Sequence, residues 1–142
     1  MYFAGGRTDR EVSDIVDIYN LVNLTIVTKV YLAVPRYGLA SVTIGKTMFF
    51  AGGYNTTATG IVDVWVPGTG TYYTTTLQET KYGLVGITFN GMAIFAGGHN
   101  GRGSCSDTLD IYRAKTDSGS TTTTTSTTST TTTIGNNAPP GS

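Results

Sequence analysis

Short runs of hydrophobic residues alternate with turn-forming residues over most of the chain. Runs at 39–44, 48–51, 84–89 and 92–96 are bounded by glycine or polar residues, and two of them end at a Gly-Gly pair. Short runs bounded in this way are typical of β-strands. No stretch places hydrophobic residues at the i, i+3, i+4, i+7 spacing of an amphipathic helix. We therefore expect an all-β chain.

Three short motifs recur along the sequence with one period. Phe-Ala-Gly-Gly occurs at 3–6, 50–53 and 95–98. A largely hydrophobic strand with a central aspartate occurs at 15–19, 61–65 and 108–112, and a cation followed by Tyr-Gly-Leu occurs at 36–39 and 81–84. Their spacing stays between 45 and 47 residues. A fixed period shared by separate motifs indicates an internal repeat.

Each complete repeat predicts four strands. One follows Tyr-Gly-Leu, the second ends at Gly-Gly, and the third carries the aspartate. The Tyr- and Thr-rich segment at 72–77 is the expected fourth and outermost strand. Four short strands in 45 to 47 residues match one blade of a β-propeller.

At these positions the sequence resembles the Kelch-repeat β-propeller family. A Kelch blade carries an arginine, an aromatic-rich strand ending in Gly-Gly, and a strand ending in an aromatic residue. Arg36, Phe49, Gly52, Gly53 and Trp65 occupy these places in the one complete repeat. The resemblance covers about residues 1 to 113 and implies an incomplete propeller of four-stranded antiparallel blades.

The sequence departs from the Kelch pattern at three places. Trp65 stands where tyrosine is usual, Tyr72 or Tyr73 replaces the later tryptophan, and Lys81 replaces the second arginine.

The expected domain boundaries follow from the repeat. Residues 1–116 form a partial propeller, in which blade one lacks its first strand, 36–80 is a full blade, and blade three lacks its last strand. Adjacent repeats must cover one another's faces. Three explanations of the incomplete ring are therefore expected. The sequence is a truncated gene model, an oligomer or partner supplies the remaining blades, or the chain forms a marginally stable open sheet.

Residues 117–142 form the second expected segment. They are mostly Thr and Ser and contain almost nothing hydrophobic to bury, so we expect a disordered tail. The composition suits an O-glycosylated stalk as well as a low-complexity linker.

The charge balance argues against nucleic acid as a partner. Nine basic and nine acidic residues leave no net charge, so nucleic-acid binding is not expected. Hydrophobic runs are too short for a membrane-spanning helix. No cofactor is implied.

The candidates for catalysis or metal binding are few. His99 is the sole histidine and Cys105 the sole cysteine, whereas most zinc sites need more ligands of these types. We predict no catalytic and no metal-binding residue, and hence no enzyme.

The repeated polar residues are interpreted as structural. A buried carboxylate needs a partner, and the repeated cation is available to form an Asp–cation bond that ties one blade to the next. The predicted structural residues are Gly5, Gly6, Gly52, Gly53, Gly97, Gly98, Asp17, Asp63, Asp110, Tyr19, Trp65, Tyr112, Arg36 and Lys81.

Function is expected in the loops that follow each Gly-Gly, because propeller loops gather at one rim. The candidate binding residues are Arg7, Arg10, Tyr54, Asn55, His99, Asn100 and Arg102. The first hypothesis is a protein-interaction module. The alternative is a cell-surface or extracellular adhesive, carbohydrate-associated propeller on a glycosylated stalk. Two N-glycosylation triplets, at Asn23 and Asn55, favour the cell surface or extracellular space slightly over the cytoplasm.

Overall fold

The computed structural model describes residues 1–113, which form ten strands and no helix. The strands are β1 (Tyr2–Ala4), β2 (Ile15–Tyr19), β3 (Ile26–Tyr31), β4 (Ala40–Ile44), β5 (Thr47–Ala51), β6 (Ile61–Val66), β7 (Thr71–Thr76), β8 (Val85–Phe89), β9 (Met92–Ala96) and β10 (Leu109–Arg113). The all-β expectation is confirmed for these residues. The predicted tail at 117–142 lies outside them. Within the described part, no helix has the length and hydropathy needed to cross a membrane.

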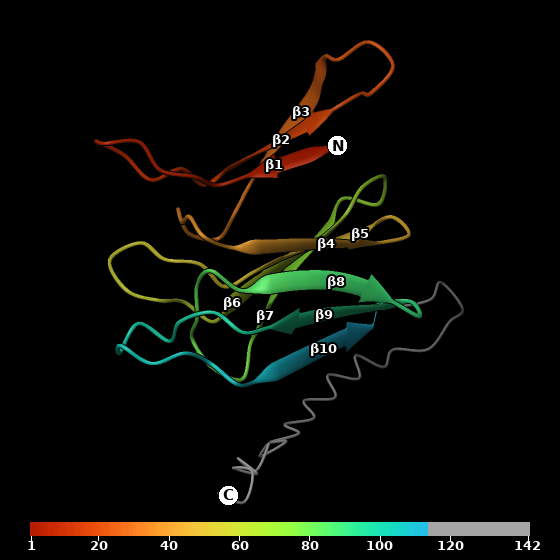
Figure 1. Cartoon of the computed structure of the whole chain (residues 1–142). Helices are drawn as coiled ribbons and strands as arrows, with labels where there is room; N and C mark the ends of the chain where they lie inside the picture. Colours follow the sequence, from red (N-terminus) through yellow and green to blue (C-terminus); the bar gives the residue numbers. More distant parts are fainter. Residues whose placement is uncertain (114–142) are drawn as a thin grey trace, which may run out of the picture.

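The strands form three antiparallel sheets in chain order (Figure 1). Sheet 1 contains β1, β2 and β3; sheet 2 contains β4 to β7; sheet 3 contains β8, β9 and β10. Within each sheet, strands that are consecutive in the chain pair antiparallel, and the chain passes to the next sheet after β3 and after β7. Within residues 1–113, sheet 1 has no counterpart of β4 and sheet 3 has no counterpart of β7.

The strand register repeats from sheet to sheet. The Phe of each Phe-Ala-Gly-Gly lies opposite the aspartate of the next strand: Phe3 opposite Asp17, Phe50 opposite Asp63, and Phe95 opposite Asp110. Cross-strand partners share one face of a sheet. Equivalent residues therefore occupy equivalent places in all three sheets.

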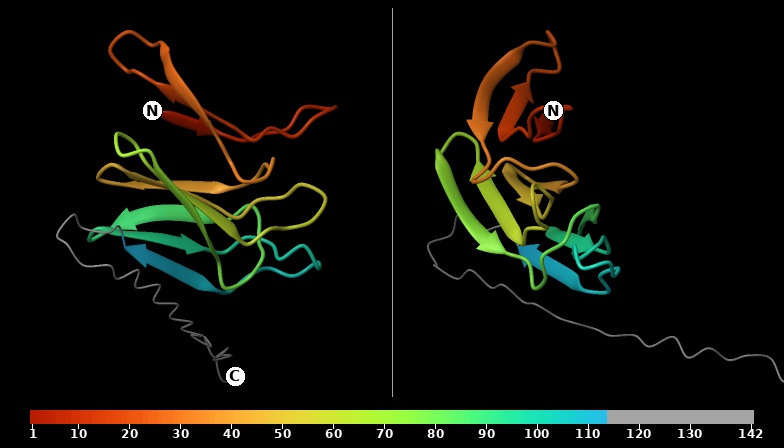
Figure 2. Two further views of the ribbon diagram at one scale, coloured as in Figure 1. Left: turned by 180° about the vertical axis from the view of Figure 1, so that it is seen from behind. Right: turned by 90° about the vertical axis from the view of Figure 1, so that its left-hand side faces the viewer.

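The sheets stack face to face (Figure 2). One hydrophobic cluster lies between sheets 1 and 2; its buried members are Val16, Leu32, Met48 and Phe50. A second lies between sheets 2 and 3; its members include Val42, Phe49, Ala51, Val62, Val64, Ala93, Phe95 and Tyr112. Sheet 2 is thus covered on both faces.

The first glycine of Gly-Gly makes room for the segment that enters the next sheet. Gly52 has φ +64°, and a Cβ on it would lie 2.4 Å from the Lys81 carbonyl oxygen. The same carbonyl accepts a hydrogen bond from Gly53 N at 2.9 Å. A side chain at position 52 would therefore push the segment into sheet 3 away from sheet 2.

A buried ion pair lies in sheet 2. Arg36, fully buried on the segment between β3 and β4, donates to Asp63 Oδ2 at 2.5 Å and to the carbonyl oxygens of Gly52 and Phe50. Asp63 Oδ1 accepts from the backbone N–H of Ala33 at 2.8 Å. Hydrogen bonds on both carboxylate oxygens compensate for the loss of water.

Sheet 3 repeats the ion pair with lysine. Lys81 Nζ lies 2.8 Å from Asp110 Oδ2, and both side chains are fully buried. This contact is an ion pair outside hydrogen-bond geometry; the ammonium donates instead to the carbonyl and hydroxyl oxygens of Thr108. Asp110 Oδ1 accepts from Gln78 N at 2.7 Å.

In sheets 2 and 3, the aspartate therefore holds the segment that arrives from the preceding sheet. Sheet 1 differs: Asp17 faces Lys29 of β3 at 3.5 Å, and the two side chains are 29% and 49% exposed. Position 17 thus has the repeated aspartate without the buried cation that accompanies it elsewhere.

Candidate functional site

The three loops that follow Gly-Gly project from the same edge of the stacked sheets (left in Figure 1). Most of the hairpin turns lie at the opposite edge. The loops are positioned by pairs of backbone hydrogen bonds. Tyr37 and Tyr54 exchange two N–H···O bonds of 3.0 and 2.8 Å, and Tyr82 and His99 exchange two of 3.0 and 2.9 Å.

Side chains at these bridges form a continuous row together with Arg7, and we call it the aromatic row: Arg7, Tyr37, Tyr54, Tyr82 and His99. The ring centroids of Tyr37 and Tyr54 are 5.7 Å apart, those of Tyr54 and Tyr82 are 5.0 Å apart, and those of Tyr82 and His99 are 5.7 Å apart. These are ordinary aromatic contact distances. The row crosses from sheet 2 to sheet 3 between Tyr54 and Tyr82.

Arg7 begins the aromatic row. Its guanidinium carbon lies 5.4 Å from the Tyr37 ring centroid, within cation–π range, and its Nη1 donates to the Tyr37 hydroxyl at 3.3 Å. Arg7 and His99 are exposed, whereas the three tyrosines are partly buried. The row therefore presents aromatic surface between two polar ends.

A cavity of about 450 Å³ follows this row and is lined by Arg7, Tyr37, Tyr54, Tyr82, His99, Gly101 and Gly103. An adjoining cavity of about 280 Å³ is lined by Arg10 and Asn55 together with residues near Arg7. Both are open hollows rather than enclosed chambers. They suit a ligand that lies across the surface.

The structure brings together three of the residues that the sequence singles out as binding candidates: Arg7, Tyr54 and His99. Arg10 and Asn55 lie beside them. Asn100 and Arg102 line neither cavity; Asn100 Oδ1 accepts from Arg102 N at 2.9 Å and so holds the loop at 100–104 in shape.

Tyr37 and Tyr82 are the residues missed as site candidates. Each follows the repeated cation, and the motif at 36–39 and 81–84 indicates a repeat without marking a binding residue. The available signal was their tyrosine identity at a repeated, partly exposed place beside the Gly-Gly loops.

Glu79 fastens the loop after β9 to the segment leaving sheet 2. The Ser106 hydroxyl donates to Glu79 Oε2 at 2.7 Å. This hydrogen bond, followed by one from Asn100, holds the pKa of Glu79 below its usual value. The loop that carries His99 is therefore attached on two sides.

His99 and Cys105 lie close together, with Nδ1 and Sγ 3.8 Å apart. Among residues 1–113, no three His, Cys, Asp or Glu side chains gather where they could hold a metal ion. The chemistry of the aromatic row consists of aromatic faces, hydroxyls, one imidazole and one guanidinium. Such groups bind by stacking and hydrogen bonding.

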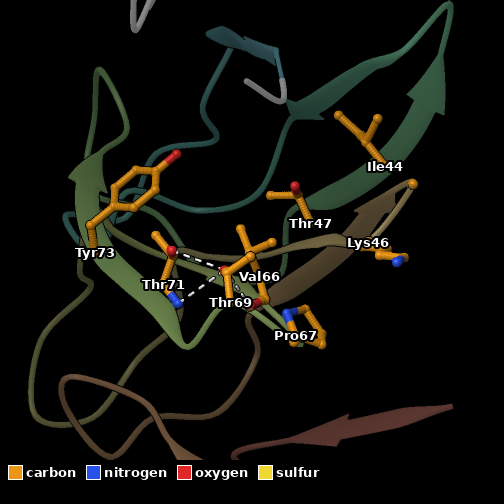
Figure 3. Close-up of a pocket in the computed structure, with 10 residues that line it drawn as sticks. Ile44, Lys46, Thr47, Val66, Pro67, Thr69, Thr71 and Tyr73 are labelled. Atoms are coloured by element: carbon orange, nitrogen blue, oxygen red, sulfur yellow. Dashed lines mark hydrogen bonds between the residues drawn. The ribbon is translucent and has the colours of Figure 1, made fainter. Parts of the chain in front are cut away.

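A larger cavity, of about 650 Å³, lies at the opposite edge between the β4–β5 and β6–β7 turns (Figure 3). Ile44, Val66 and Pro67 line it with several threonines, and Lys46 is its one charged lining residue. The Thr69 and Thr71 hydroxyls bond to each other at 2.9 Å. This cavity gathers fewer groups for recognition than the aromatic row.

The two glycosylation candidates are exposed. Asn23 lies in the β2–β3 turn, where its Oδ1 accepts from the Thr25 hydroxyl at 2.8 Å, and Asn55 lies in the loop after β5.

In comparisons with known proteins, no family model matches this chain, and no curated protein matches it either.

Proposed function

We propose that this chain is part of a Kelch-type β-propeller that binds a protein partner along the aromatic row. Three antiparallel sheets with one repeated register, stacked face to face, support the blade interpretation. Arg36, Gly52 and Gly53 occupy places of the Kelch pattern in the sequence, and Arg36 forms a buried ion pair with Asp63.

The observation that carries the binding proposal is the continuity of the row across two sheets. Tyrosine and arginine are enriched at the energetic centres of protein interfaces, because they combine large contact area with a polar end. The row offers three tyrosines between Arg7 and His99 in a hollow of about 450 Å³. A loop or extended segment of a partner fits this open shape.

The test is a comparison of two edges of the same molecule. Proteins captured by the full chain are compared by quantitative mass spectrometry with those captured by the Tyr54→Ala/Tyr82→Ala double variant. A Lys46→Ala variant at the opposite edge serves as the matched control. The expected result is a partner kept by the control and lost by the double variant.

Binding of that partner is then measured directly. Loss of either tyrosine should weaken Kd by about tenfold or more, equivalent to about 1.4 kcal/mol. Equal affinity of the wild-type chain and the double variant, with both folded by circular dichroism, would contradict the proposal.

The exposed Asn23 and Asn55 support a second candidate, an extracellular propeller associated with carbohydrate. Here the aromatic row would stack on sugar rings, and the tail at 117–142 would serve as the stalk. The full chain is expressed through a secretory pathway and treated with an N-glycosidase. A mass decrease abolished by Asn23→Gln and Asn55→Gln supports this candidate, and an unchanged mass counts against it.

A further inference from the structure

The two outer sheets of the stack each leave one face uncovered by the described residues, and these two faces are of different kinds. We define the aspartate face of a sheet as the face that carries the repeated aspartate. In sheet 2 it includes Met48, Phe50, Asp63 and Trp65, and it packs against sheet 1. We define the valine face as the other face. In sheet 2 it includes Val42, Phe49, Val62 and Val64, and it packs against sheet 3.

Both contacts within the chain obey the same rule. The valine face of sheet 1 meets the aspartate face of sheet 2, and the valine face of sheet 2 meets the aspartate face of sheet 3. The same type of interface thus occurs twice within the chain. Among the described residues, no sheet covers the aspartate face of sheet 1 or the valine face of sheet 3.

The valine face of sheet 3 is hydrophobic and open. Val85, Ile87 and Phe89 of β8 are 65%, 54% and 59% exposed. Their counterparts Ala40 and Val42 in sheet 2 are 7% and 6% exposed. An exposed hydrophobic patch on one sheet face marks a contact surface.

The aspartate face of sheet 1 exposes a hydrophobic side chain and has, within residues 1–113, a carboxylate oxygen without a hydrogen bond. Phe3 is 56% exposed, whereas its counterparts Phe50 and Phe95 are 2% and 0% exposed. Asp17 Oδ1 is buried without a hydrogen bond among the described residues. By contrast, Asp63 Oδ1 and Asp110 Oδ1 each accept a backbone N–H from the segment leaving the preceding sheet.

We propose that two copies of this chain associate head to tail, with the valine face of sheet 3 of each copy on the aspartate face of sheet 1 of the other. Because the chain already makes this contact twice internally, each end carries the surface that fits the other end. Two copies supply six sheets, within the roughly four to eight blades of known propellers. One copy falls short of that range and three copies exceed it.

The inference rests on the propeller part of the proposed function and not on partner binding. Neither open face contains a residue of the aromatic row. Variants in the row and variants in the faces therefore test separate claims, and the failure of one leaves the other standing.

The test uses the full chain and one aspartate substitution on each face. Ile87→Asp disables the valine face of sheet 3, and Phe3→Asp disables the aspartate face of sheet 1. Both side chains are more than half exposed, so the fold of a single copy should tolerate the changes. Val22→Asp, at a 95% exposed position in the β2–β3 turn, is the control.

Sedimentation equilibrium should give twice the chain mass for the wild-type and control proteins. Each face variant alone should be a single copy, because every head-to-tail contact needs both faces. An equimolar mixture of the two variants should regain a two-copy species, joined through their intact faces.

Folding is monitored by circular dichroism and by fluorescence of Trp65, which packs between sheets 1 and 2. A face variant that fails to fold is replaced by Phe89→Asp for the valine face or by Tyr31→Asp for the aspartate face, where Tyr31 is 62% exposed. A wild-type chain that stays a single copy, forms long polymers, or still pairs after either substitution overturns the proposal.

Discussion

The central sheet and the first sheet contain nearly the same strand, Ile-Val-Asp followed by Ile-Tyr or Val-Trp, in different surroundings. In sheet 2, Asp63 is 1% exposed and receives Arg36, Tyr72 and the Ala33 N–H. In sheet 1, the Asp17 side chain is 29% exposed and faces the half-exposed Lys29.

The difference shows what the neighbouring segment contributes. The strand places the carboxylate, but the cation and the backbone donor come from the segment that enters the sheet. Burial then makes the pair energetically important, because a charge removed from water depends on the partners that remain. The same motif is therefore structural in sheet 2 and nearly neutral in sheet 1.

The largest expected effect comes from removing this carboxylate. Asp63→Ala leaves the Arg36 guanidinium buried without its countercharge and should cost about 3–5 kcal/mol of unfolding free energy. Asp17→Ala removes a partly exposed ion pair and should cost about 1 kcal/mol or less. Urea denaturation in the Ile87→Asp background, where the chain is expected to stay a single copy, provides both values. Equal losses would contradict the comparison.

The next effect concerns the glycines of sheets 2 and 3. Gly52→Ala and Gly97→Ala both place a side chain at positive φ, +64° and +69°, which costs about 1–2 kcal/mol. At position 52 the new Cβ also meets the Lys81 carbonyl, whereas position 97 has no neighbour within 4 Å among the described residues.

Gly52→Ala should therefore lower the free energy of unfolding by about 1–3 kcal/mol more than Gly97→Ala does. This difference is the usual cost of overpacking. The same denaturation measurement in the same background determines both losses. A Gly97→Ala loss equal to or larger than that of Gly52→Ala would show that the segment carrying Lys81 does not depend on this close approach.

The smallest effect is a pH dependence confined to the Asp63 cluster. Burial, followed by the hydrogen bond to Asp63, raises the pKa of Tyr72 to about 12 from an ordinary value near 10. The folded state thus holds this proton more tightly. Its contribution to stability is complete below about pH 10 and is lost as the pH rises toward about 12.

Tyr72→Phe should reduce the loss of stability across this pH window, and tyrosinate absorbance should show one late-titrating tyrosine fewer in this variant than in the wild-type protein. Tyr73 and Tyr112, whose pKa values are also raised by burial, contribute equally in both proteins and cancel in the difference. An identical pH profile for the two proteins would remove Tyr72 from the cluster.

The sequence predicts the parts of the fold that depend on local pattern. The runs at 39–44 and 84–89 match β4 (Ala40–Ile44) and β8 (Val85–Phe89), because strand length and turn glycines are encoded nearby. β3 (Ile26–Tyr31) was not singled out, since its alternation is weak and most of its residues are exposed.

The site was less predictable than the strands. Arg7, Tyr54 and His99 were expected from their place after Gly-Gly, but Tyr37 and Tyr82 enter the row from other segments. Their contact depends on how the backbone bridges align across the stack, which no local pattern specifies. Likewise, the sequence repeats Asp17 without showing that its cation would be an exposed lysine.

The paired backbone bonds at the bridges have a consequence for how this surface can be diversified. Positions 7, 54 and 99 are equivalent in the repeat, yet they carry arginine, tyrosine and histidine. Because main-chain atoms hold Tyr54 and His99 in place, we expect the side chains at positions 54 and 99 to vary with little effect on folding. A library randomised at these two positions would sample new specificities on an unchanged scaffold.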